Sequence, residues 1–244
     1  MPLENIGWHW RKLYAPPQVM RMKNHLTTIL NVSVVDPGPA GDVTKYPRHD
    51  TVLITGDGAC MPEDVKLFES WDVPHDLYCV NRSMLYFERQ VDHWAAIDIE
   101  ESGWFAENVN FKIEPLDGRK IVRHTIGDGS FAYDVYWKMD ISEDNTFQRR
   151  VLVGNTGYFA ILTAINMGYK KIVIAGMPLN MDHCWYESDD ADGPNWMGWM
   201  YVQWMDFKLN HPSADRVKSL SGYSKFILGE ATREWIINGS VSCH

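Results

Sequence analysis

The chain has 244 residues, of which 45% are hydrophobic and 23% charged, a balance that suits one large α/β domain with an ordinary buried core. Its formal net charge of −9 argues against a general affinity for nucleic-acid phosphates. No apolar run approaches the roughly 18 residues of a transmembrane helix, and the first residues lack the apolar core of a signal peptide, so we expect a cytoplasmic protein without a membrane span.

The N-terminal part differs in composition from the rest of the chain. Residues 1–30 mix Trp8, Trp10 and Tyr14 with basic side chains, which indicates an amphipathic arm docked on the domain or on a second subunit, and a homo-oligomer is therefore possible. A Pro- and Gly-rich stretch over 37–47 is typical of a linker. We expect an arm and linker over 1–48 and one folded domain over 49–244.

The first strong strand signal is the apolar run TVLIT at residues 51–55. Gly56, Asp57 and Gly58 follow at once, and Pro62 then suits the first turn of a helix. The turn lacks both the Walker pattern and the third glycine of a dinucleotide fingerprint. Its glycines either allow a tight turn or place backbone N–H groups against a phosphate or ribose.

Two further strands and a change of pattern follow. Residues 76–80 and 93–97 are short apolar runs, and Asn81 begins the connection after the first of them. From residue 109 to 139 alternating segments separated by Asp-Gly and Gly-Asp-Gly turns predict β-hairpins inserted into the domain.

Residues 151–180 give the clearest signal for fold class. A helix of about twelve residues, capped by Asn155 or Thr156, feeds an uninterrupted Ile-Val-Ile-Ala strand, as in half of a βαβ unit. Gly176 then begins a polar loop at the carboxyl end of that strand, where open α/β sheets bind ligands. We therefore expect a single α/β domain with a mostly parallel sheet flanked by helices.

The C-terminal part predicts a helical lid. A polar, acidic loop over 181–195 precedes an aromatic-rich helix over 196–210, a short strand over 216–220 and a final helical region. Several of the 11 tryptophans fall between Trp185 and Trp204, which suggests an aromatic-lined cleft or a subunit contact. The acids at 189–192 are better explained as a solvated loop than as a metal-binding Asp-x-Asp motif, and we expect no metal site.

Three blocks of the chain together resemble a known group of enzymes. The blocks are TVLITGDGACMPED, DLYCVNRSMLYF and NTGYFAILTAINMGYKKIVIAGMPLN, 52 residues in all. In this order they resemble the bacterial Rossmann-like sialyltransferases and the related 6-hydroxymethylpterin diphosphokinase-like proteins. The resemblance implies a Rossmann-like domain that binds a nucleotide or a nucleotide-activated sugar.

The resemblance also implies roles for particular residues. The residues that match the nucleotide-binding positions of these families are Gly56, Asp57, Gly58, Asn81, Thr156, Gly157 and Gly176. Asp57 stands where the family has Asn, and Pro178 stands where it has Asp, so the identity of the donor is open. In those sialyltransferases tyrosines neutralise the departing phosphate and a later histidine is the general base, without a metal. The corresponding candidates here are His183, Tyr186 and His211.

Three functions remain open on this basis. The first is a glycosyltransferase-like enzyme that moves a sugar from a nucleotide donor to an unknown acceptor and needs no cofactor. The second is a diphosphokinase-like transfer from ATP to a small hydroxymethyl compound, which would need Mg²⁺. The third is a nucleotide-binding module without catalytic activity. His211 has an alternative explanation too, as a cap at a helix C-terminus.

Overall fold

The computed structural model describes residues 32–97, 121–125, 134–139, 156–179 and 197–238. The strands are β1 (Val32–Asp36), β2 (Thr51–Thr55), β3 (Asp76–Val80), β4 (His93–Ala95), β5 (Val122–Thr125), β6 (Val135–Met139), β7 (Lys171–Ala175) and β8 (Val217–Ser219). The helices are α3 (Met61–Glu69), α6 (Thr156–Met167), α7 (Met197–Asn210), α8 (Gly222–Leu228) and α9 (Arg233–Asn238). Short 3-10 turns lie at η2 (Gly38–Ala40), η3 (Val43–Lys45), η4 (Asn81–Tyr86) and η6 (Ala214–Arg216).

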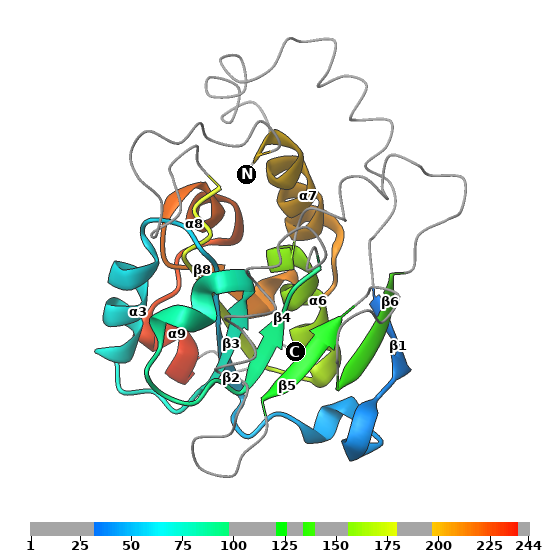
Figure 1. Cartoon of the computed structure of the whole chain (residues 1–244). Coiled ribbons are helices and arrows are strands. Elements are labelled where there is room, and N and C mark those ends of the chain that lie inside the picture. Colours follow the sequence, from blue (N-terminus) through cyan, green and yellow to red (C-terminus); the bar gives the residue numbers. More distant parts are fainter. Residues whose placement is uncertain (1–31, 98–120, 126–133, 140–155, 180–196, 239–244) are drawn as a thin grey trace.

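The strands form one eight-stranded sheet in the order β1-β6-β5-β4-β3-β2-β7-β8 (Figure 1). All neighbouring pairs are parallel except β1 with β6, which is antiparallel at the sheet edge. The predicted α/β class with a mostly parallel, helix-flanked sheet is therefore confirmed. None of the described helices is long and apolar enough to cross a bilayer.

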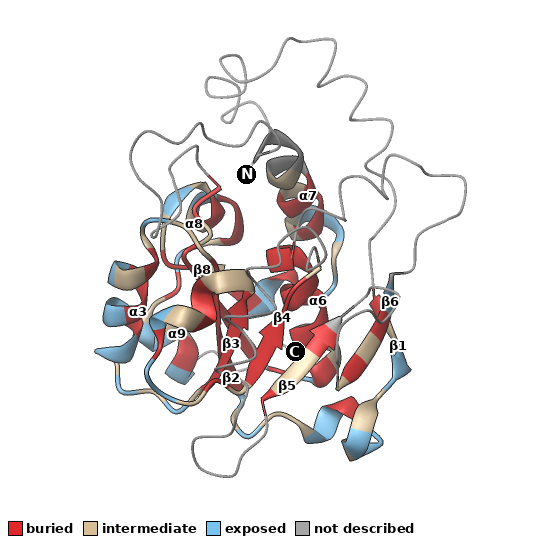
Figure 2. Cartoon of the chain, in the orientation of Figure 1, coloured by how far each residue is buried: buried red, intermediate tan, exposed pale blue. Residues whose placement is uncertain are grey.

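Helices cover both faces of the sheet, so its central strands are buried on both sides (Figure 2). Alternate residues of each strand enter two separate cores. Val52 and Ile54 of β2 pack in the core under α6, whereas Leu53 packs in the core under α3. This arrangement explains why β2 is an unbroken apolar run, since neither of its faces meets water.

The helix ends follow their local sequence. Pro62 stands near the start of α3, with Glu63 and Asp64 in the first turn, where negative charge is favoured by the helix dipole. Gly168 ends α6 with a φ of 97°, a left-handed conformation that glycine adopts without strain. Both features match the sequence-based expectation.

The insertion of β-hairpins predicted for 109–139 is wrong for its two described strands. β5 and β6 pair in parallel, with His124 opposite Val135, and both belong to the main sheet. The Asp-Gly and Gly-Asp-Gly signals are local, whereas strand direction is decided by the neighbours available in the sheet. Residues 98–120 and 126–133 lie outside the described residues.

One strand was not expected from the sequence. β1 lies within the segment predicted to be arm and linker, and it completes the sheet by pairing with β6. Val43, from the predicted linker, is buried in the α6 core together with Val32 of β1. The sheet thus begins before residue 49, while residues 1–31 lie outside the described range.

Candidate functional site

The carboxyl ends of the central strands lie level with one another. Thr55 pairs with Cys79 on one side and with Ala175 on the other, while Val80 pairs with Ala95 of β4. The loops that follow β2, β3 and β7 therefore leave the sheet along the same edge. This edge carries most of the described residues that the sequence marked as nucleotide-binding.

A buried hydroxyl network holds the ends of β2 and β3 together. Ser83 Oγ lies 2.8 Å from the Thr55 carbonyl, 2.8 Å from the Val80 carbonyl and 3.0 Å from Thr55 Oγ1, and it accepts from the Val80 N–H at 3.0 Å. Ser83 is fully buried, so these contacts replace water for its own hydroxyl, for the Thr55 hydroxyl and carbonyl, and for the Val80 N–H and carbonyl. The loops that start there are consequently anchored at their bases.

The glycine turn after β2 packs against the loop after β7. Gly56 N–H donates to the Ala175 carbonyl at 2.9 Å, and Gly58 N–H donates to the Gly176 carbonyl at 2.8 Å. A Cβ on Gly58 would lie 2.6 Å from Pro178 and 2.8 Å from the Gly176 oxygen. Of the two explanations offered for these glycines, the geometry supports tight packing, because the two N–H groups that would face a phosphate already have protein partners.

Gly176 and Pro178 complete this packing. Gly176 has a φ of 65°, and a Cβ there would lie 2.5 Å from Met61 Cβ. The Pro178 carbonyl accepts from Tyr223 N–H at 2.7 Å, at the start of α8, and Pro178 also fills the space in front of Gly222. The loop after β7 therefore fills the crevice between β2 and β7 with protein atoms.

A buried carboxylate ties these loops together. Asp64 Oδ2 accepts from Gly176 N–H at 2.9 Å and from Ser221 Oγ at 2.6 Å, and Cys60 Sγ lies 3.0 Å from the same hydroxyl. Burial raises the pKa of Asp64, only partly offset by these hydrogen bonds. Burial also raises the pKa of Cys60 to about 12, so its thiol is a poor nucleophile at neutral pH.

Asp57 and Asn81 lie on the other side of β2, at adjoining strand ends. Asp57 Oδ2 accepts from Arg82 N–H at 3.4 Å, so the two loops are in contact. Asn81 has a φ of 51°, and its carbonyl accepts from the indole N–H of buried Trp94 at 2.9 Å. Its backbone is thereby held in the left-handed conformation that Asn tolerates better than most residues.

Thr156 and Gly157 form the first turn of α6 and are both buried. The helix packs against β2 and β3 and leads into the amino-terminal end of β7. Because Tyr169, just after its last turn, reaches Asp76 at the amino-terminal edge, its first turn lies toward the carboxyl edge. The structure thus places these two residues at the same edge as Asp57 and Asn81.

His211 lies elsewhere, just after the end of α7. Its ring stacks on Phe207 with 4.8 Å between centroids, and its Nδ1 accepts from Ser213 N–H at 3.1 Å. Burial, and then the charge of Arg216, lower the pKa of His211, so the neutral ring carries its proton on Nε2. The lone pair that would accept a proton is occupied by the Ser213 N–H, which argues against a role as general base, and at the helix end it is the His211 backbone N–H that donates, to the Phe207 carbonyl at 2.9 Å. His183 and Tyr186 lie outside the described residues.

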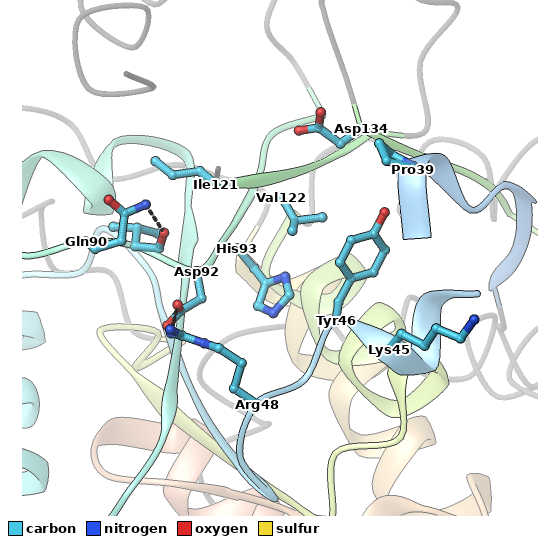
Figure 3. Close-up of a pocket in the computed structure, with 11 residues that line it drawn as sticks. Pro39, Lys45, Tyr46, Arg48, Gln90, Asp92, His93, Ile121, Val122 and Asp134 are labelled. Carbon is cyan, nitrogen blue, oxygen red and sulfur yellow. Dashed lines mark hydrogen bonds and ion pairs between the residues drawn. The ribbon is translucent and has the colours of Figure 1, made fainter. Parts of the chain in front are cut away.

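The structure also shows a polar cluster at the opposite, amino-terminal edge of the sheet. A pocket of about 340 Å³ lies there, with Tyr46, Arg48, Asp92, His93 and Val122 among the residues of its wall (Figure 3). Sequence reasoning missed it, because its residues come from four separate segments and form no motif.

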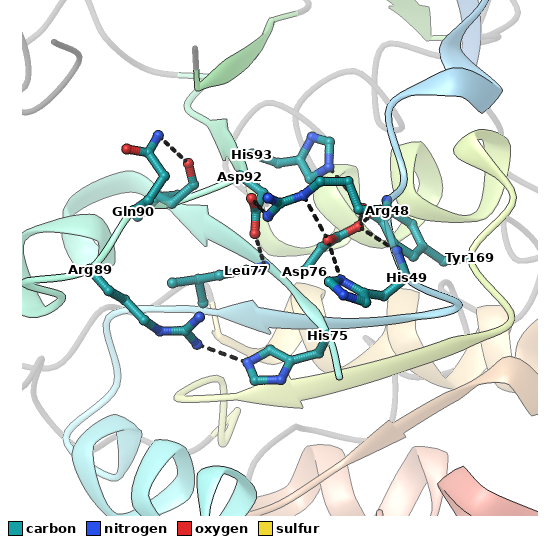
Figure 4. Close-up of polar contacts among 11 residues, drawn as sticks. Arg48, His49, His75, Asp76, Leu77, Arg89, Gln90, Asp92, His93 and Tyr169 are labelled. Atoms are coloured by element: carbon teal, nitrogen blue, oxygen red, sulfur yellow. Dashed lines mark hydrogen bonds and ion pairs between the residues drawn. The ribbon is translucent and has the colours of Figure 1, made fainter. Parts of the chain in front are cut away.

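Asp76 is the centre of this cluster (Figure 4). Its carboxylate accepts from Arg48 N–H at 2.8 Å and Tyr169 O–H at 2.7 Å, and it pairs with His49 Nδ1 at 2.8 Å. Burial alone would raise the pKa of Asp76, but these hydrogen bonds outweigh it and hold the pKa below its ordinary value. Arg48 also pairs with Asp92, so it bridges two carboxylates.

Among the described residues, no group of three or more His, Cys, Asp or Glu side chains could hold a metal ion. The acidic stretch at 189–192 lies outside that part of the chain. Comparisons of the chain with protein-family models, with curated proteins and with solved structures find no match.

Proposed function

We propose that the chain is a Rossmann-like, glycosyltransferase-like enzyme that binds a nucleotide-activated sugar over the carboxyl ends of β2 and β3. The observation that supports this most directly is the pair of polar residues, Asp57 and Asn81, on adjoining strand ends at the edge where open parallel sheets bind ligands. The strand order supports the fold part of this proposal only. β3 and β4 lie on one side of β2 and β7 and β8 on the other, as in dinucleotide-binding domains, but the crevice between β2 and β7 where such domains bind their ligand is filled here by the loop after β7.

The packing of the glycine loops determines where the ligand would bind. Because the loop after β7 fills the space beside β2, the donor would lie toward β3 and β4 instead. There the Asp57 carboxylate would accept hydrogen bonds from ribose or sugar hydroxyls, and the Asn81 amide would both donate and accept. A hydroxyl-rich donor suits this chemistry better than one held mainly through its phosphates. The charged diphosphate would lie nearer the start of α6.

The reaction would break the bond between the sugar's anomeric carbon and the donor phosphate and form a bond to an acceptor oxygen. The acceptor hydroxyl would lose its proton to a base, and the nucleotide would leave with the bonding electrons. His211 is poorly suited as that base because its acceptor nitrogen is engaged by Ser213. His183, with Tyr186 beside the leaving group, is the base we propose.

The test is calorimetric binding of CMP-, UDP- and GDP-sugars, followed by an assay for donor hydrolysis, with ATP and Mg²⁺ as a parallel arm. We expect one class of nucleotide-sugar to bind and ATP with Mg²⁺ not to bind. Binding of ATP alone would favour the diphosphokinase-like alternative. If no nucleotide-sugar binds, the glycosyltransferase proposal is wrong.

The variant Asn81→Gly sharpens this test. Glycine keeps the left-handed backbone and removes only the side-chain amide, so we expect donor affinity to fall about tenfold, the loss of roughly one hydrogen bond to a polar ligand. The matched control is Asp72→Gly, which replaces another residue of positive φ (53°) on an exposed turn after α3. An equal affinity in wild type and Asn81→Gly would exclude Asn81 from the site.

A further inference from the structure

A continuous chain of hydrogen bonds runs through the buried face of the sheet under α6. It starts at Trp137 in β6, passes through His124 in β5 and His93 in β4 to Tyr169, and ends at Asp76 in β3. The successive distances are 3.0, 3.1, 2.8 and 2.7 Å. Each of these side chains is at most 1% exposed, so no water competes for the contacts.

The chemistry of the two ends fixes the direction of every bond. Trp137 can only donate, so Nδ1 of His124 accepts and its Nε2 carries the proton. That proton is donated to Nδ1 of His93, and the Nε2–H of His93 is donated to the Tyr169 oxygen. Tyr169 in turn donates to the Asp76 carboxylate. Both histidines are therefore neutral, with the proton on Nε2.

The hydrogen-bond chain has no site for another proton. A second proton on His124 would be bound to Nδ1 and would point at the indole N–H of Trp137. A second proton on His93 would also be bound to Nδ1 and would point at the Nε2–H of His124. Either event sets two donors against each other in a buried site, which costs at least one hydrogen bond and its desolvation.

The surroundings give little compensation for such a charge. His93 faces the Asp76 carboxylate, the Arg48 guanidinium, and the rings of Tyr78 and Tyr169. His124 faces His93, Tyr78 and Trp137, none of them an acid. Burial lowers the pKa of His93 to about 4, with Asp76 opposing and Arg48 adding to the shift, and burial together with neighbouring His93 holds the pKa of His124 well below its ordinary value.

We propose that this hydrogen-bond chain is an acid-sensitive latch. It holds β4, β5 and β6 against β3 at neutral pH and releases them when its two histidines take up protons. The released part of the sheet includes a wall of the amino-terminal pocket, since His93 and Val122 line that pocket (Figure 3). Acid would therefore open the pocket without first unfolding the strands on the other side, β2, β7 and β8.

The main test is hydrogen exchange of the full chain between pH 7.5 and 4.5, corrected for the intrinsic pH dependence of exchange. Below pH 6.5 the open state binds protons that the latched state cannot. We therefore expect protection of the β4–β6 amides to fall about tenfold per pH unit for each histidine, while β2 and β7 stay protected. Unchanged protection of β4–β6, or loss together with β2 and β7 in one step, would overturn the proposal.

A second measurement tests the direction of the bonds and needs no variant. ¹⁵N NMR of histidine-labelled protein at pH 7 distinguishes the two tautomers and the charged ring. We expect both His93 and His124 to be neutral with the proton on Nε2. A charged ring, or a proton on Nδ1, in either residue would contradict the latch.

The double variant Trp137→Phe/His124→Phe changes the number of protons that are taken up when β4–β6 open. It replaces both partners of the Trp137–His124 bond by apolar rings, removes the donor to Nδ1 of His93 as well, and leaves His93 as the only histidine of the hydrogen-bond chain. We expect the pH slope of β4–β6 exchange to fall from about two protons to about one. The matched control, Tyr86→Phe, alters an exposed ring after β3 and should leave the slope at two. Equal slopes in the double variant and the control would refute the proposed role of His124.

Discussion

Gly176 shows how a single missing side chain lets the loop after β7 pack against the loop after β2 and the start of α3. Its φ of 65° is one that residues with a Cβ rarely adopt, and a Cβ there would lie 2.5 Å from Met61 Cβ and 2.6 Å from the Gly56 carbonyl oxygen. Gly168 is also in a left-handed conformation, with a φ of 97°, but a Cβ there would meet nothing within 4 Å. A side chain at Gly168 would therefore cause backbone strain alone, whereas one at Gly176 would cause both backbone strain and steric overlap.

We expect Gly176→Ala to lower the free energy of unfolding by about 3 kcal/mol or more, because the alanine adds overlap with fixed backbone atoms to the cost of the left-handed conformation. Gly168→Ala should cost about 1 kcal/mol, the conformational cost alone. Urea denaturation of both variants and the wild type measures the difference. Equal losses would show that the loops after β2 and β7 move apart easily.

At the scale of elements, Asp64 joins α3 to the loops that follow β7 and β8. Its carboxylate accepts from both Gly176 N–H and Ser221 Oγ, so one side chain positions two loops at the carboxyl edge. The relative positions of α3, β7 and β8 are therefore set by a polar contact as well as by the two apolar cores.

Asp64→Ala should destabilise the protein by about 2–4 kcal/mol, because it leaves the Gly176 N–H and the Ser221 hydroxyl without their acceptor. Asp64→Asn should cost less, since an amide oxygen can still accept from Gly176. Thermal or urea unfolding at pH 7 compares the two variants. If the free energy of unfolding of Asp64→Ala lies within about 0.5 kcal/mol of wild type, the hydrogen bonds of Asp64 contribute nothing measurable to stability.

Elements were predictable from the sequence to the extent that their signals are local. The run at β2, the Pro62 start of α3 and the Gly168 end of α6 each depend on neighbouring residues, and the structure confirms them. β1 is as short as β2 but lies at the sheet edge with Val35 exposed, so it lacks the fully buried apolar run that marks β2. The direction of β6 depends on β5 and β1, which the turn residues before it cannot specify.

For the whole molecule, the buried histidines predict a loss of stability in mild acid. A histidine with a depressed folded pKa contributes stability above its unfolded value, near 6.5, and loses it as the pH falls toward its folded pKa, about 4 for His93. Asp64 acts in the opposite direction, because its raised pKa makes its contribution largest in acid. Asp206, whose pKa burial also raises, acts with Asp64, whereas His75 and His211, whose pKa burial lowers, act with the two histidines, so the net effect is a loss.

We expect the free energy of unfolding to fall by about 3 kcal/mol or more between pH 7 and pH 4.5, at up to about 1.4 kcal/mol per pH unit for each histidine. Urea denaturation curves at half-unit steps measure this dependence, and Trp137→Phe/His124→Phe should weaken it. A free energy that stays constant down to pH 4.5 would mean that the histidines are already charged or that the folded state accommodates the protons.

By itself, the sequence determined the α/β class, the central parallel strands, and the glycine turns and Asn81 at their carboxyl ends, because apolar runs, caps and turn residues act over a few positions. Only the tertiary structure decided that the glycines pack against Pro178 and that the acceptor nitrogen of His211 is occupied. It also joined Asp76, His93, His124 and Tyr169 into one chain. These residues are far apart in sequence and share no motif, and buried hydrogen bonds between distant strands depend on strand order and register, which local patterns do not encode.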